Sequence, residues 1–280
     1  MAEPTKDELN DQKHTIEVDT NNLVRYWQER DEVMLKDRDI INLIKPEAIT
    51  GKIQWVSNEP KVFMDTAQSL ISLNVPRFRF PMDINFEPDE KKKMNKAERL
   101  SIGIQRLLDK RQADTGGTYW LRDLAYWVLL GSYSVFAWVA KENGETKFIA
   151  DIWDPITVYP QWDTNGLIKC IRCYEVEKIT AISMAREFYQ KGLKFDFVEP
   201  STEDARPKVI NYWRKTMKGN KPIIENAILI AGQVIKPLTV QTKLDRIPIH
   251  VGSVGSPDRT TPNWIQRRGE PIFAADRDFY

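Results

Sequence analysis

Histidine and cysteine are scarce in this sequence. Its 280 residues include two of each, namely His14, His250, Cys170 and Cys173. A disulfide framework of the kind that staples small secreted domains needs more cysteines than this. Two histidines with no nucleophile pattern near them give no support to a Ser-His-Asp arrangement. The scarcity therefore argues against a disulfide-stapled secreted protein and against a hydrolase of the triad type.

Long hydrophobic runs and a strong net charge are also missing. The longest apolar run, around residues 127–130, is far too short to cross a bilayer. Residues 1–22 are polar and contain no apolar segment of the kind that a signal peptide requires. The formal net charge of +1 argues against a general nucleic-acid coat, which would be strongly basic. We therefore expect a soluble protein, made in a cytoplasm, with no membrane partner.

Motifs for binding nucleotides or metals are absent as well. No segment matches the G-x-x-x-x-G-K-[ST] phosphate-binding loop. Cys170 and Cys173 have the spacing of half a zinc site, but only the two histidines could complete it. The segment around these cysteines reads as a strand, in which residues three apart point to opposite faces. We expect two ordinary strand cysteines, and no metal, cofactor or catalytic group.

Aromatic residues and regular hydrophobic patterns are abundant. The chain is 41% hydrophobic and contains nine tryptophans, nine tyrosines and eleven phenylalanines, which is enough to form a core. Residues 1–22 lack periodicity, so we expect a flexible N-terminal arm, with Asn21 or Asn22 capping the first helix. Helical spacing then predicts helices within 23–44, 63–75, 96–112 and 119–130. These helices make residues 23–132 a helical portion.

The predicted helices have expected inward faces. In the helix within 63–75, Phe63, Ala67, Leu70 and Ile71 share one face and should point into the core. Gly131 follows the last helix where a C-terminal cap favours glycine. The outer faces of the helices at 23–44 and 96–112 carry charges of both signs, which suits ion-paired contacts with neighbouring molecules.

From residue 133 the hydrophobic period changes to two. Turn signals at 143–144 and 163–166 separate alternating runs, so 133–177 reads as a four-stranded antiparallel meander. A helix ending at Gly192 and further strands turning near Gly219 and Gly232 complete a β-rich portion at 133–251. Residues 252–280 read as a loop that leads into the start of a helix, so we expect the chain to continue beyond Tyr280. The fold class predicted is α+β.

The stretch "DIWDPITVYPQWDTNG" at 151–166 combines acids with Trp153 and Trp162. It could be a catalytic acid pair, a sugar-binding aromatic surface or a structural corner. Paired acids for glycoside hydrolysis lie roughly 5–9 Å apart, which spacing in sequence does not exclude. Aspartate before proline is, however, typical of a turn opener whose carboxylate accepts from backbone amides. We favour a structural corner formed by the following four residues: Asp154, Pro155, Asp163 and Gly166.

A second segment, at 77–93, mixes basic and aromatic residues. Arg77 and Arg79 alternate with phenylalanines, and Lys91, Lys92 and Lys93 follow. Such interleaving occurs in surfaces that bind a nucleic-acid strand. An edge strand that leads into a charged helix is the interpretation we favour. A nucleic-acid-binding module remains an alternative function, and a carbohydrate-active enzyme a further one.

Four stretches, taken in order, resemble the portal proteins of tailed bacteriophages. They cover most of residues 50–280, and none is a catalytic motif. A short strand, a helix and a proline-punctuated run are similar to the early portal segment. A helix, a glycine and the first strand of the wing hairpin follow, and then a D-P-x-x-[VI]-x-P corner with a D-x-x-G turn. The stretches are WVSNEPKVFMDTAQSLISLNVPRFRFP, YWLRDLAYWVLLGSYSVFAWV, IADIWDPITVYPQWDTNG and IPIHVGSV with GEPIFAADRDFY.

This resemblance implies a structural protein and not an enzyme. It implies a portal-like wing with N-terminal helices and an antiparallel β meander, followed by the start of a stem helix. The chain would form a ring of about twelve identical subunits at one capsid vertex of the virion, assembled in the host cytoplasm. Its partners would be the major capsid protein, the terminase large subunit and a neck or adaptor protein. Double-stranded DNA would pass through the ring without base contacts. Portal proteins are usually longer, with stem, clip and crown parts after the wing.

Overall fold

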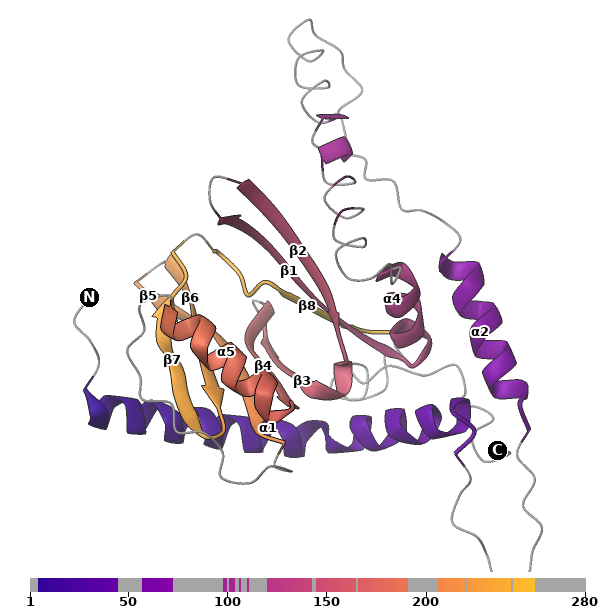
Figure 1. Ribbon diagram of the computed structural model, residues 1–280, viewed down its shortest axis with the longest axis horizontal. Helices are drawn as coiled ribbons and strands as arrows, with labels where there is room; N and C mark the ends of the chain where they lie inside the picture. The colour runs from indigo at the N-terminus through magenta and orange to yellow at the C-terminus, as the bar shows by residue number, and fades with distance from the viewer. Residues whose placement is uncertain are drawn as a thin grey trace, which may run out of the picture. The chain divides into compact units, whose positions relative to one another are not determined.

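The structure is a computed structural model that combines helices with antiparallel sheets, so the α+β class is confirmed (Figure 1). The described residues are 5–44, 57–72, 98–99, 101–103, 106, 110, 120–142, 145–164, 166–190, 206–219, 221–242 and 244–254. The chain divides into two compact units, each discontinuous in sequence. Unit 1 comprises Met1–Val33 and Asp154–Ile249, and unit 2 comprises Met34–Trp153 and His250–Tyr280. The boundary expected near residue 132 does not coincide with this division.

Helix α1 spans Lys6–Ile41, so the flexible arm expected at residues 1–22 is wrong for residues 6–22. Thr5 and Glu8 start the helix. The Thr5 amide donates to a Glu8 carboxylate oxygen at 2.7 Å, and the Glu8 amide donates to the Thr5 hydroxyl at 3.3 Å. This reciprocal pair is a capping box, which satisfies amides that the first turn leaves without helical partners. The helix therefore begins at Thr5 and not at Asn21 or Asn22.

The buried residues of α1 recur at alternating spacings of four and three. This heptad-like spacing places one residue per turn on a single face of the helix. Five members of the set are apolar and three are polar. The set consists of Ile16, Thr20, Leu23, Trp27, Arg30, Met34, Asp37 and Ile41.

Unit 1 contains a five-stranded antiparallel sheet whose strands follow one another in sequence order. The strands are β3 (Val158–Asp163), β4 (Gly166–Glu175), β5 (Lys208–Lys218), β6 (Lys221–Ile230) and β7 (Gln233–Val240). The turns expected at Gly219 and Gly232 both lie between paired strands. Ala231 and Gly232 have φ values of 51° and 71°, which is the two-residue turn type that matches strand twist.

Helices α1 and α5 (Lys178–Gln190) cover opposite faces of this sheet. On β6, Ala227 and Leu229 pack with α1, whereas Ile228 and Ile230 pack with Ala181 and Ala185 of α5. Alternate residues of a strand point to opposite faces, so each buried strand is apolar on both sides. Unit 1 is therefore a three-layer arrangement, and its larger core lies between α1 and the sheet.

Unit 2 contains helices and a smaller sheet. Its elements are α2 (Glu59–Ser72), α4 (Trp120–Leu129), β1 (Ser132–Glu142), β2 (Glu145–Trp153) and most of β8 (Ile249–Ser253). The sheet order is β2-β1-β8, and β1 pairs with β2 up to Glu142 and Glu145, as expected for a hairpin at 143–144. Gly131 follows α4 with a φ of 93°, which confirms the glycine cap.

The inward face predicted for α2 is wrong. The buried residues are Pro60, Met64 and Gln68, and the Gln68 amide donates to the Arg122 carbonyl at 2.8 Å. The four residues expected inside lie on other parts of the helix: Phe63, Leu70 and Ile71 are exposed, and Ala67 is half-buried. The helix packs through a short stripe that includes a glutamine, because Gln68 satisfies a backbone carbonyl near α4. Apolar periodicity alone could not indicate this.

The four-stranded meander expected at 133–177 is divided between two sheets. Strands β1 and β2 form one hairpin, and β3 and β4 belong to the sheet of unit 1. The break falls at Pro155, which lacks an amide donor and opens the 3-10 helix η1 (Pro155–Thr157). Parts of the sequence-based description lie outside the described residues: the strand before residue 57, the segment at 77–93, the inward side of the 96–112 helix, and residues 255–280.

Candidate functional site

The polar side chains of unit 1 gather where helix α1 meets the sheet. They form two groups. The Asp19 cluster consists of Asp19, Lys169, Tyr212, Arg214, Thr216 and Glu225. The Asp31 cluster consists of Trp27, Arg30, Asp31, Asp154 and Tyr159.

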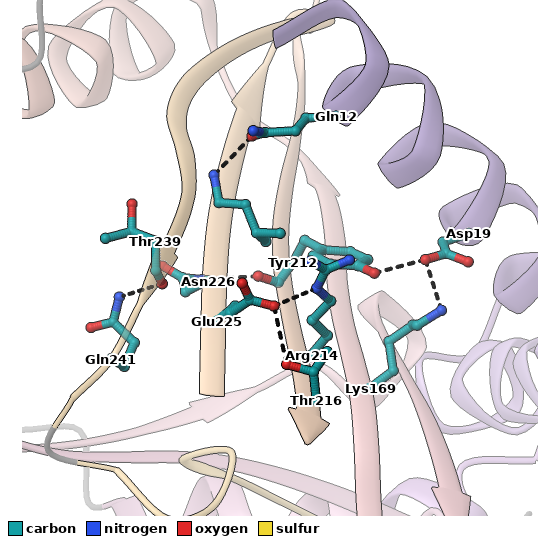
Figure 2. Close-up of polar contacts among 11 residues, drawn as sticks. Gln12, Asp19, Lys169, Tyr212, Arg214, Thr216, Glu225, Asn226, Thr239 and Gln241 are labelled. Atoms are coloured by element: carbon teal, nitrogen blue, oxygen red, sulfur yellow. Dashed lines mark hydrogen bonds and ion pairs between the residues drawn. The ribbon is translucent and has the colours of Figure 1, made fainter. Parts of the chain in front are cut away.

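In the Asp19 cluster, one carboxylate oxygen of α1 joins two strands (Figure 2). Lys169 Nζ of β4 and the Tyr212 hydroxyl of β5 each donate to Asp19 Oδ2 at 2.7 Å. Burial and the hydrogen bond to Asp19 raise the pKa of Tyr212, so the phenol stays protonated and remains a donor. The cluster ties the helix to two strands with a single acceptor atom.

The same cluster continues along β5 and β6. Arg214 and Glu225 lie opposite each other in register, and Arg214 Nε donates to Glu225 Oε2 at 2.7 Å. Thr216 also donates to that oxygen, at 3.4 Å (Figure 2). The charges of the ion-paired residues therefore balance: Lys169 and Arg214 against Asp19 and Glu225. Such a balanced arrangement fixes strand register and attracts neither anions nor cations strongly.

Helix α1 also supplies partners for both edge strands of the sheet. Gln12 Oε1 accepts from the Leu238 amide of β7 at 3.0 Å. At the other edge, Trp27 Nε1 donates to the Pro160 carbonyl of β3 at 2.9 Å. Edge strands expose unpaired backbone groups that can template aggregation. Side chains of one helix therefore protect both edges of this sheet.

Arg30 is the most buried charged group of the Asp31 cluster, with 2% of its surface exposed. Its Nε and one terminal nitrogen donate to Asp31 Oδ1 at 2.8 and 2.7 Å, and that terminal nitrogen also donates to the Val158 carbonyl at 3.1 Å. The guanidinium lies 4.7 Å from the centre of the Trp27 ring and 5.8 Å from that of Tyr159. Buried arginines need this combination of counter-ion, acceptor and aromatic faces.

Asp31 has a shifted protonation equilibrium. Burial raises the pKa of Asp31 to about 6, and the nearby charge of Asp154 adds to the increase, whereas Arg30 opposes it. The Tyr159 side chain forms a hydrogen bond with Asp31, and burial raises the pKa of Tyr159. A carboxyl group with such a pKa can gain or lose a proton near neutral pH. This is the one group of the cluster whose charge state changes there.

Asp154 and Pro155 lie at the chain reversal before β3. Asp154 Oδ1 accepts from the Ile156 amide at 2.9 Å, and Pro155 occupies the first position of η1. The Thr157 hydroxyl and amide both donate to the Asp154 carbonyl, at 2.7 and 3.0 Å. This is a local turn held by an aspartate side chain. The carboxylate oxygen is thus engaged with the backbone of its own turn.

Asp163 and Gly166 lie at the end of the next hairpin. They are paired across β3 and β4, and Gly166 has a φ of 102°, which favours glycine. The neighbouring Trp162 packs edge-on against Trp27, with ring centres 6.0 Å apart. The structure therefore places Asp154 and Asp163 at opposite ends of β3, in two separate turns.

Trp153 belongs to unit 2, where it is 5% exposed. Its ring stacks on Phe136 with centres 4.8 Å apart and an interplanar angle of 7°. Trp138 continues the stack on the other side of Phe136, at 6.3 Å. The Trp153 face is therefore covered by a protein ring, and a sugar could not stack on that face.

Both cysteines lie on β4, as expected. Cys170 is fully buried, and Cys173 packs at the core between α1 and the sheet. Neither is in a disulfide, and burial raises the pKa of both thiols. Across the residues that the structure describes, no group of three or more metal-ligating side chains comes together.

Sequence reasoning missed Arg30 and Asp31. They lie in the run "QERDEVMLKDRD", which reads as the solvated face of a helix. The signal that could have found Arg30 is the spacing of Trp27 and Met34, which places position 30 on the same face. Asp31 carries no such signal, because its burial depends on β3 and on the turn at Asp154.

No protein-family model matches the chain, and no curated protein is significantly similar to it. Within the described part of the chain, no helix is both long and apolar enough to span a bilayer.

Proposed function

We propose that this chain is a structural subunit of a phage portal, the ring at one capsid vertex through which double-stranded DNA is packaged and ejected. One observation carries the proposal. The stretch that resembles the portal wing folds in the expected order, as helix α4, Gly131, the β1–β2 hairpin, the Asp154–Pro155 corner and β3. Order matters here because each motif alone is weak.

The polar groups described above suit a structural role. In unit 1 they bind helix to strand or strand to strand, and most are engaged with backbone groups or with one another. A subunit of a rigid ring needs this kind of fixed internal geometry. The proposed activity is therefore mechanical: the ring guides DNA and docks the terminase, the capsid and a neck protein.

The surface charge is consistent with a channel protein. A formal net charge of +1 over 280 residues gives little general attraction for phosphate. DNA moves most easily past a surface that does not bind it tightly. The exposed side of α1 between residues 25 and 39 carries both signs, which suits ion-paired contacts with a neighbouring subunit. That set is Arg25, Glu29, Glu32, Lys36 and Asp39.

Two alternatives remain as outcomes of the test. A carbohydrate-active enzyme is not favoured, because Trp153 is covered by Phe136 and Asp154 is bonded to its own turn. A nucleic-acid-binding module would use Arg77, Arg79 and Lys91 to Lys93, which lie outside the described residues. It would show DNA affinity that falls steeply with salt concentration.

Localisation of the chain on native particles tests the proposal. We expect antibody-bound gold, directed at this chain, to label a single vertex where head and tail join. Label scattered over the capsid surface, along a tail fibre or absent from the particle would contradict it. Purified chain should show no glycosidase turnover, and retention of duplex DNA on a column should be weak even at low salt.

A further inference from the structure

The Asp31 cluster lies where the chain leaves and re-enters unit 1. The chain passes between the units at Val33–Met34 and again at Trp153–Asp154. Asp31 precedes the first passage by two residues, and Asp154 is the first residue after the second. The cluster therefore joins, within unit 1, the two segments at which the chain crosses the unit boundary.

The charges within the cluster are unequal when every acid is ionised. Arg30 of α1 is the cation that acts on Asp31, whereas Asp154, from the turn before β3, is a second carboxylate that opposes its ionisation. Tyr159 of β3 donates a hydrogen bond, and Cys173 of β4 acts on Tyr159 as a further group that resists negative charge. One buried guanidinium thus faces two carboxylates.

The surroundings of Asp31 offer little water to stabilise that extra charge. Its side chain is 13% exposed, and that of Arg30 is 2% exposed. Arg30 also donates to the Val158 carbonyl and lies over two aromatic rings. Neutral Asp31 leaves one cation against one anion in the cluster, and ionised Asp31 leaves one against two.

We propose that the Asp31 cluster is a proton-controlled clamp: protonated Asp31 keeps α1 fastened to the start of β3, and release of that proton to solvent loosens the contact. Burial raises the pKa of Asp31 from 3.8 to about 6, which agrees with this direction. A group whose pKa is raised in the closed state binds its proton more tightly there. The stabilisation is present below the ordinary pKa and is lost as pH rises to about 6. The clamp does not depend on the proposed function.

Hydrogen exchange of the whole chain, corrected for the intrinsic rate, measures the opening. Between about pH 5 and about pH 7.5, protection in residues 27–33 and 158–161 should fall by roughly tenfold to hundredfold, because each pKa unit corresponds to a factor of ten. Asp31→Asn keeps the side chain neutral, so it should retain the low-pH protection at both pH values. Asp19→Asn is the matched control on the same helix, and it should keep the pH response in those segments.

An equal pH response in the unaltered chain and in Asp31→Asn would overturn the proposal. If Asp31→Asn does not fold, carboxyl NMR of the unaltered chain decides. An Asp31 midpoint near 6, reached together with loss of protection, would support the clamp. A midpoint near the ordinary aspartate value, or a midpoint near 6 with no change of protection, would refute it.

Discussion

Trp27, Gln12 and Asp154 each form a hydrogen bond with a backbone group outside regular strand pairing. The acceptor or donor is the Pro160 carbonyl for Trp27, the Leu238 amide for Gln12 and the Ile156 amide for Asp154. Backbone polar groups that remain unpaired in a partly buried place cost free energy. At the residue scale, stability should therefore depend on these side chains more than their number suggests.

Asp154→Ala should lower the free energy of unfolding by about 1 kcal/mol, by analogy with the loss of a helix N-cap. The variant removes the acceptor of the Ile156 amide, which caps η1. Asp154→Asn is the control, because asparagine keeps an acceptor oxygen while it removes the charge. Urea unfolding measures both. A loss in Asp154→Asn equal to that in Asp154→Ala would show that charge, and not capping, is what matters.

The cysteines should bind no stoichiometric zinc, because Cys170 and Cys173 point to opposite faces of β4. Elemental analysis of protein purified without chelator is the measurement. We also expect Cys170 to react with iodoacetamide more slowly than Cys173, since Cys170 is fully buried and its thiol pKa is raised. Bound zinc that disappears in the Cys170→Ser, Cys173→Ser variant would contradict this.

At the scale of elements, helix α1 is the largest difference between the sequence-based expectation and the structure. Residues 6–22 are polar, but Ile16 and Thr20 continue the buried spacing of Leu23 and Trp27 toward the N-terminus. The capping box at Thr5 and Glu8 was readable in the sequence as T-x-x-E. It was missed because residues 1–22 contain few apolar side chains, whereas the helix is held by polar contacts such as that of Asp19.

Thr5→Ala should fray the start of α1, with a local loss of about 1 kcal/mol. The reason is that the Glu8 amide loses the Thr5 hydroxyl as its acceptor. Hydrogen exchange of residues 6–12 reports the loss. Thr15→Ala is the control, because Thr15 is exposed and its hydroxyl only bonds back to the Asp11 carbonyl. Faster exchange in both variants alike would point to helix propensity in place of capping.

Trp27→Phe should destabilise the chain by about 1 kcal/mol, the usual net value of one hydrogen bond. Phenylalanine keeps an aromatic ring beside Arg30 but cannot donate to the Pro160 carbonyl. Tyr26→Phe is the control on the neighbouring residue, which is 54% exposed and should be nearly neutral. Thermal unfolding distinguishes the two. Equal stability of Trp27→Phe and the unaltered chain would show that the edge of β3 needs no partner from α1.

Strands were easier to predict than their assignment to sheets. Period-two alternation and glycine turns located all eight strands except β8, and the hairpins at 143–144 and 163–166 have the expected pairing. The division at Pro155 was only partly readable, because proline indicates that the chain leaves a ladder but not that a second sheet follows. For the same reason the turn at Asp154 was predicted from sequence, whereas its proximity to Asp31 was not.

At the scale of the whole molecule, the two units explain why sequence-based domain boundaries failed. The chain leaves unit 1 after Val33, re-enters it at Asp154 and leaves again after Ile249. A discontinuous unit has no single change of composition at its border, so a linear reading placed the border at residue 132. Long-range contacts such as that of Asp19 with Tyr212 create the unit, and no local pattern encodes them.

A reconstruction of the head-to-tail vertex by electron cryomicroscopy, calculated without imposed symmetry, tests the proposed function most directly. The account predicts a closed ring of about twelve copies whose density fits the sheet of unit 1, covered by α1 on one face and α5 on the other. Helix α1 should present its charged side to the neighbouring copy. A vertex ring whose density fits a different chain, with this protein elsewhere in the particle or absent from it, would contradict the account.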